Sequence, residues 1–103
     1  MTSYFLAEAA DTDLNEIFNY SYRKWGPEEA FKYLEQLHEC AEALASGSAR
    51  FKKLSGLLPN LRMMRCQHHY IFCEARKDGP SAILAIFHER MDLMTRIAER
   101  LGR

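Results

Sequence analysis

The stretch ILAIFHERMDLM, residues 83–94, runs from an apolar segment directly into a polar cluster. Its first five residues are all apolar, as in a strand that is covered on both faces of a sheet. Histidine, glutamate and arginine at positions 88–90 end the apolar run, and Asp92 has the side chain of a helix N-cap. This stretch therefore predicts a central strand that leads into a short helical tail, residues 92–103.

Two segments that precede this strand in the sequence have the composition of strands that could pair with it. Polar turns that contain His, Lys, Asp, Gly and Pro separate them, as expected for antiparallel neighbours. The predicted strands are LRMMRC (61–66), YIFCEA (70–75) and AILAIFH (82–88). The preceding segment FKKLSGLLPN, residues 51–60, has no such pattern and is predicted to be a loop.

The first half of the chain has helical spacing instead. Apolar residues recur every three or four positions from Leu14 to Trp25, and Asp11 or Thr12 is suited to cap that helix. Gly26 and Pro27 then form a link that ends one helix and starts another, which is predicted to reach Ala45. So short a link between two amphipathic helices predicts an antiparallel helical hairpin.

With a short strand at residues 4–6, the order is strand, helix, helix, three strands, helical tail. A helical hairpin must bury its apolar face, and the strands offer the only sheet. We therefore expect a single α+β domain over residues 1–103, with the hairpin packed on an antiparallel sheet of three C-terminal strands.

Composition narrows the class of protein. With 48% hydrophobic and 27% charged residues, the chain reads as a folded protein rather than a disordered one. No apolar run reaches the ~20 residues needed to cross a bilayer, and acidic residues follow the N-terminal apolar residues too closely for a signal peptide. We expect a cytoplasmic protein with no membrane partner.

Charge is balanced overall but unevenly spread. Residues 1–49 hold nine acidic and three basic residues (net −6), whereas residues 50–78 hold seven basic and two acidic ones (net +5). A dedicated nucleic-acid binder is normally basic throughout, because phosphate neutralisation supplies most of its affinity. Direct sequence-specific nucleic-acid binding is therefore not expected.

Three cysteines, Cys40, Cys66 and Cys73, have no disulfide-framework spacing, so reduced thiols are predicted. Cys66 lies near His68 and His69 in the sequence, and a distant His88 would complete a set of four zinc ligands. Adjacent histidines on a turn point apart, however, and no Cys-x-x-Cys spacing is present. Neither a metal nor a cofactor is expected.

Three motifs in order resemble the ParE branch of the ParE/RelE superfamily of toxin–antitoxin toxins. They are DLNEIFNYSYRKWGPEEAFKYLEQL (13–37), LRMMRCQHHYIFC (61–73) and ILAIFHERMD (83–92). The order β-α-α-β-β-β is also similar to that superfamily, and the resemblance covers essentially the whole chain.

The resemblance implies a bacterial toxin of a type II toxin–antitoxin system, of the kind that serves plasmid maintenance, held inactive by a cognate antitoxin. ParE-type toxins act on DNA gyrase as protein inhibitors, without chemistry of their own. RelE-type relatives share the fold but cleave mRNA on the ribosome, so fold alone does not separate the two activities. A ribosome-dependent mRNA interferase is the alternative, and a member that only binds antitoxin is a third possibility.

The strand-end cluster and tail carry the predicted action on the target, because arginine and methionine are enriched at protein interfaces. The predicted target-binding residues are His88, Arg90, Met91, Asp92 and Arg96. No catalytic residue is expected for an inhibitor. For the interferase alternative, Arg65 and Arg90 would clamp phosphate and His88 would serve as acid or base.

The helical hairpin is the predicted antitoxin platform. Helical spacing puts Phe18, Tyr22 and Trp25 on the core side, whereas Tyr20, Phe31 and Tyr33 fit neither core face. Exposed aromatic surface on a small protein usually marks a partner site. The predicted antitoxin-binding residues are Tyr20, Trp25, Phe31 and Tyr33.

Overall fold

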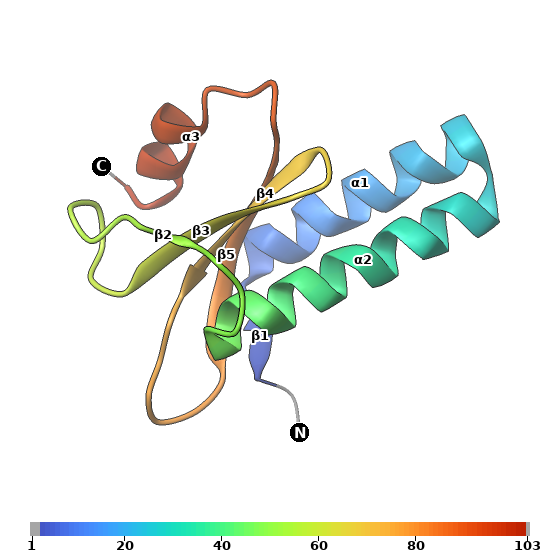
Figure 1. Cartoon of the computed structure of the whole chain (residues 1–103). Coiled ribbons are helices and arrows are strands. Elements are labelled where there is room, and N and C mark those ends of the chain that lie inside the picture. The colour runs from blue at the N-terminus through green and yellow to red at the C-terminus, as the bar shows by residue number, and fades with distance from the viewer. Residues whose placement is uncertain (1–2, 103) are drawn as a thin grey trace.

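The computed structural model describes residues 3–102 and shows one sheet with helices on both of its faces (Figure 1). In chain order the elements are β1 (Tyr4–Leu6), α1 (Glu8–Trp25), α2 (Pro27–Ser46), β2 (Lys52–Lys53), β3 (Leu61–Cys66), β4 (His69–Glu74), β5 (Ser81–His88) and α3 (Leu93–Arg100). Over this part of the chain, no helix combines the length and the apolar character needed to span a membrane.

The sheet has five strands in the order β1-β5-β4-β3-β2. The three predicted C-terminal strands are antiparallel neighbours, and the predicted α+β class, hairpin and C-terminal helix are confirmed. The sheet is larger than predicted, because β1 pairs in parallel with β5 and Lys52–Lys53 pairs with β3 inside the predicted loop. Two exposed lysines carry no strand pattern of their own, so this pairing is set by the neighbouring strand.

A one-residue link joins the two helices of the hairpin. Gly26 has φ of 90°, its N–H donates to the Tyr22 carbonyl at 2.9 Å, and its carbonyl accepts from the Ala30 N–H at 3.1 Å. Glycine tolerates this backbone angle because it has no Cβ. The first helix begins at Glu8, before the predicted caps Asp11 and Thr12. The Ala7 N–H still donates to Ile83 in β5, so the chain passes straight from sheet pairing into the helix.

Each face of the sheet has its own apolar cluster. Against the hairpin lie Leu37 and Leu44 of α2 with Ile71 and Ile83 of the sheet, all almost fully buried. On the opposite face, Phe72, Phe87, Leu61 and Ile97 pack together, covered by α3 and by the segment after β2. Strand β5 is therefore buried on both faces, as its continuous apolar sequence predicted.

The prediction of reduced thiols is wrong for two of the three cysteines. Cys40 in α2 and Cys66 at the end of β3 form a disulfide with their Cα atoms 6.2 Å apart, and Cys73 is free and buried. The two bridged residues are 26 positions apart in the sequence. Only the packing of α2 across β3 brings them together, so their spacing in the sequence carries no signal.

Candidate functional site

A groove of about 1080 Å³ runs between the hairpin and the end of β5. One wall comes from α1 and α2, including Tyr20, Trp25 and Tyr33. The other comes from the β3–β4 turn, from the end of β5 and from α3 with the segment before it. Ile17, Ile86 and Phe87 add apolar side chains to the lining, and we call this feature the groove throughout.

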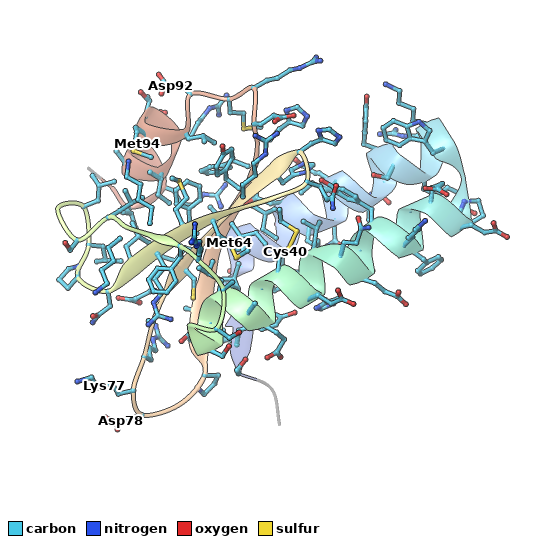
Figure 2. All side chains as sticks on the ribbon, viewed as in Figure 1. Cys40, Met64, Lys77, Asp78, Asp92 and Met94 are labelled. Carbon is cyan, nitrogen blue, oxygen red and sulfur yellow. A yellow bond between two sulfur atoms is a disulfide. The ribbon has the colours of Figure 1, made fainter. Side chains whose placement is uncertain are left out.

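The groove gathers most of the residues predicted to touch the target. His88, Arg90, Met91 and Arg96 all line it, and the Met91 side chain is 42% exposed. The fifth residue, Asp92, lies apart from the groove lining and caps α3. Its carboxylate accepts from the Thr95 N–H at 3.3 Å and from the Thr95 hydroxyl at 2.8 Å, which confirms the predicted N-cap. Figure 2 shows Asp92 and Met94 at this end of α3.

The four predicted antitoxin-binding aromatics divide between two faces of the hairpin. Tyr20, Trp25 and Tyr33 line the groove, whereas Phe31 packs edge-on against Phe18, with ring centroids 5.1 Å apart, away from it. Lys24 lies over the Tyr20 ring, with Nζ 5.4 Å from its centroid, and over the Trp25 ring at 5.0 Å. The Lys24 amine also donates a hydrogen bond to the Tyr20 hydroxyl at 3.1 Å, so one lysine contacts both aromatic side chains.

The prediction that Tyr22 and Trp25 belong to the core is wrong. Their side chains are 48% and 58% exposed, because the linked end of the hairpin extends past the sheet (Figure 1). The same periodic pattern therefore buries side chains only where strands lie beneath the helices.

A buried histidine marks the point where the hairpin leaves the sheet. The Tyr33 hydroxyl bonds to Nδ1 of His69 at 2.6 Å and accepts from the His68 N–H at 3.3 Å. Burial lowers the pKa of His69 to about 4, and Coulombic interactions with His88 and His68 act in the same direction, so this ring is neutral at physiological pH. Burial raises the pKa of Tyr33, so its hydroxyl stays protonated beside Nδ1 of the neutral His69 ring.

Next to this pair, an exposed ion cluster ties the end of β3 to the end of β5. Glu89 accepts from Arg65 Nη2 at 2.6 Å and from His68 Nδ1 at 2.9 Å. The hydrogen bond from His68 lowers the pKa of Glu89, and the charge of Arg65 acts in the same direction. Arg65 also donates to the Gln67 carbonyl at 3.0 Å. The Nε and Nη2 groups of Arg65 therefore already form hydrogen bonds within the protein.

The residues of the interferase alternative are therefore only partly brought together. His88 and Arg90 share the groove, and the Arg90 N–H donates to His88 Nδ1 at 3.1 Å, whereas Arg65 is absent from the groove lining. Within residues 3–102, no three His, Cys, Asp or Glu side chains are arranged to hold a metal ion.

Sequence reasoning missed an ion pair that joins the two walls of the groove. Arg100 of α3 donates from Nη1 and Nη2 to the two carboxylate oxygens of Asp13 in α1, at 2.9 and 3.1 Å. The same pair satisfies the backbone of β5, because Asp13 accepts from the Ile86 N–H at 3.0 Å and Arg100 donates to the Leu84 carbonyl at 3.0 Å. The pair thereby forms hydrogen bonds with backbone groups of β5 that lie beyond the part of β5 paired with the short β1.

Comparison with known proteins adds relatives of nearly equal length. The chain is 48% identical over 101 residues to Toxin ParE of Escherichia coli, covering 98% of both chains. It is 27% identical over 90 residues to Toxin ParE1 of Mycobacterium tuberculosis, covering 87% of this chain and 92% of that one. The match to the Escherichia coli protein thus spans both walls of the groove.

Among solved structures, the fold matches a chain of the chromosomal ParDE TA system from P. aeruginosa. The TM-score is 0.64 at 19% identity, over 85% of this chain and 98% of that one, which supports the likeness of fold. The family model for the ParE toxin of the type II toxin–antitoxin system parDE matches residues 4–93, from β1 to the start of α3. With that match, and with 48% identity to one member over almost its whole length, the chain belongs to the ParE toxin family of type II toxin–antitoxin systems.

Proposed function

We propose that this toxin inhibits DNA gyrase by binding it, and that its cognate antitoxin neutralises it by occupying the groove. One observation carries the proposal: the strand-end residues His88, Arg90 and Met91 line the same groove as Tyr20 and Trp25 of the hairpin. A partner segment held by the aromatic wall would cover the strand end at the same time. Neutralisation then needs no conformational change in the toxin.

The chemistry of the groove fits a flexible protein segment as the neutralising partner. Its lining offers apolar and aromatic side chains, with the acidic groups Glu16 and Glu29 on the helices and Arg90 and Arg96 on the opposite wall. A segment with apolar anchors and charges of both signs would match these walls. Such a segment can be disordered when free and fold as it binds.

Binding without catalysis is the mode of action that the geometry favours. RNA cleavage needs cations around the scissile phosphate and groups that transfer protons. Here Arg65 is engaged by Glu89, His69 is buried and neutral, and Nδ1 of His88 already accepts a backbone hydrogen bond. We propose the cytoplasm as the place of action, because gyrase and its DNA substrate are there.

Expression of the toxin without antitoxin tests this proposal directly. We expect growth arrest with a DNA-damage response, cleaved DNA attached to gyrase, and intact mRNA. Arg90→Ala should reduce the arrest. The control Lys77→Ala, in the β4–β5 connection away from the groove (Figure 2), should leave it unchanged.

The readouts separate the alternatives. Cleaved mRNA with undamaged DNA would overturn gyrase inhibition, and loss of that cleavage in His88→Ala would assign a catalytic role to the histidine. Normal growth despite expression of folded protein would indicate a member that only binds antitoxin.

A further inference from the structure

The disulfide joins the hairpin to the sheet at a position that the proposed function does not use. Cys40 lies in the C-terminal half of α2 and Cys66 is the last residue of β3. Figure 2 shows Cys40 on the side of α2 that faces the strands. Cys66 is 3% exposed, whereas Cys40 is only partly buried, so the two residues differ in access to solvent.

We propose that Cys40 and Cys66 form a reversible thiol–disulfide site that exchanges with small disulfides such as oxidised glutathione, with Cys40 as the entry residue. The proposal is independent of the target and of the antitoxin. It assigns a redox-dependent stability to the toxin itself.

The closed bridge fits the backbone without displacement of α2. The Cα separation of 6.2 Å lies inside the range that a disulfide spans without moving the chain. In the dithiol state, the Cys66 thiol has an acceptor in place, because the Gln36 carbonyl of α2 lies 3.4 Å from its sulfur. The Gln36 carbonyl therefore provides a polar neighbour for the Cys66 sulfur when the bridge opens.

The difference in exposure sets the order of the two exchange steps. The Cys40 thiolate attacks one sulfur of oxidised glutathione, which forms a mixed disulfide and releases one glutathione thiolate. The Cys66 thiolate then attacks the Cys40 sulfur, closes the protein disulfide and releases the second glutathione. The protein loses two electrons and two protons, which the two released glutathione molecules carry as thiols.

Cys73 provides an internal contrast. It is fully buried in the sheet, and burial raises the pKa of its thiol to about 11. Nucleophilic attack requires a thiolate with access to the incoming disulfide, and Cys73 has neither property. A reagent that distinguishes cysteines by access and thiolate content should therefore leave this residue unmodified.

Closing the bridge should stabilise the folded toxin. The crosslink joins residues 26 positions apart and so restricts the unfolded chain. The bridge also lies between the two layers of the main core, where α2 faces the end of β3. Reduction should lower the Tm by on the order of 10 °C in a domain of this size.

Three serine variants of the full chain test the order of reaction. After reduction and exposure to oxidised glutathione, we expect Cys66→Ser to gain one glutathione, mapped to Cys40 by peptide mass analysis. Cys40→Ser should be modified at least ~10-fold more slowly, because its remaining sulfur atoms are buried. In the control Cys73→Ser, the two remaining thiols should form the Cys40–Cys66 disulfide, and no glutathione should stay bound.

Thermal unfolding of the wild-type chain gives a second measurement that does not depend on any variant folding. Oxidised glutathione should remove two of the three free thiols, and a dithiol reductant should return them while lowering the Tm. The double variant Cys40→Ser/Cys66→Ser should show no such shift. Three free thiols after oxidation, equal Tm in both states, or adducts that form equally fast on Cys40 and Cys66 would overturn the proposal.

Discussion

The two ends of the helical hairpin follow one sequence pattern yet behave differently. At the base, Leu37 and Leu44 are almost fully buried against the sheet. At the linked end, Tyr22, Trp25 and Phe31 continue a similar spacing but are about half exposed. The difference arises because the strands stop short of the linked end (Figure 1). Amphipathic spacing therefore indicates which side chains share a face, whereas the neighbouring layer decides whether that face is core or partner surface.

The largest expected effect is a loss of stability when a buried side chain at the base of the hairpin is shortened. Leu44→Ala should lower the free energy of unfolding by about 3 kcal/mol, because it leaves a cavity in the core between α2 and the sheet. Urea unfolding under reducing conditions gives the value without a contribution from the disulfide. Tyr22→Ala at the linked end is the matched control and should cost less than about 1 kcal/mol. Equal losses would mean that the exposed end also carries core packing.

The free energy of unfolding should depend on pH through His69, which lies where the hairpin leaves the sheet. The pKa of His69 is lowered to about 4 in the folded protein, whereas an unfolded chain titrates near the usual 6.5. Between these values the unfolded state binds more protons, so stability is complete above pH ~6.5 and is lost as pH falls towards 4. The expected loss is on the order of 2–3 kcal/mol.

Unfolding of His69→Gln, measured over the same pH range, isolates this residue. The variant keeps polar atoms for Tyr33 but cannot titrate, so its stability should fall less steeply between pH 6.5 and 4. The stabilising contribution of Glu89 is also lost on acidification, because its pKa is lowered in the folded protein. Both proteins contain Glu89, so this contribution cancels when their pH profiles are compared. Parallel pH profiles would contradict the buried, neutral state of His69.

The linked end should contribute to binding rather than to stability. Trp25→Ala should weaken binding of the cognate antitoxin by about 30-fold, which is ~2 kcal/mol and typical of an aromatic anchor. Phe31→Ala is the control, since it removes an aromatic side chain of comparable exposure from the other face of the hairpin. Titration calorimetry measures both. A larger loss for Phe31→Ala would move the proposed antitoxin site to that face.

Local signals in the sequence predicted the elements of the fold well. Gly26 and Pro27 locate the hairpin link, Asp92 caps α3 as expected, and the apolar run of β5 marks the doubly covered strand. Each of these signals acts within a few residues of chain. The strand β2 had no signal of its own, because its two lysines pair only through their neighbour β3.

The groove was predictable only in part. The predicted arginine, methionine and aromatic residues mostly line one groove. The ion pair of Asp13 and Arg100, which joins the two walls of that groove, links residues 87 positions apart in the sequence. The pair of Cys40 and Cys66 escaped prediction for the same reason. Contacts of this kind depend on how α1, α2 and α3 are placed on the sheet, and no local pattern encodes that placement.

The smallest expected effect lies at the boundary itself, in the hydroxyl of Tyr33. Tyr33→Phe removes the hydrogen bond to His69 and leaves the His68 N–H without its acceptor, so the free energy of unfolding should fall by about 1 kcal/mol. Tyr20→Phe is the control, because the Tyr20 hydroxyl accepts a hydrogen bond from the exposed Lys24 amine, and this exposed bond should contribute little. If urea unfolding shows no difference between the two variants, the Tyr33–His69 bond does not hold the hairpin to the sheet, and the boundary between base and linked end is set by apolar packing alone.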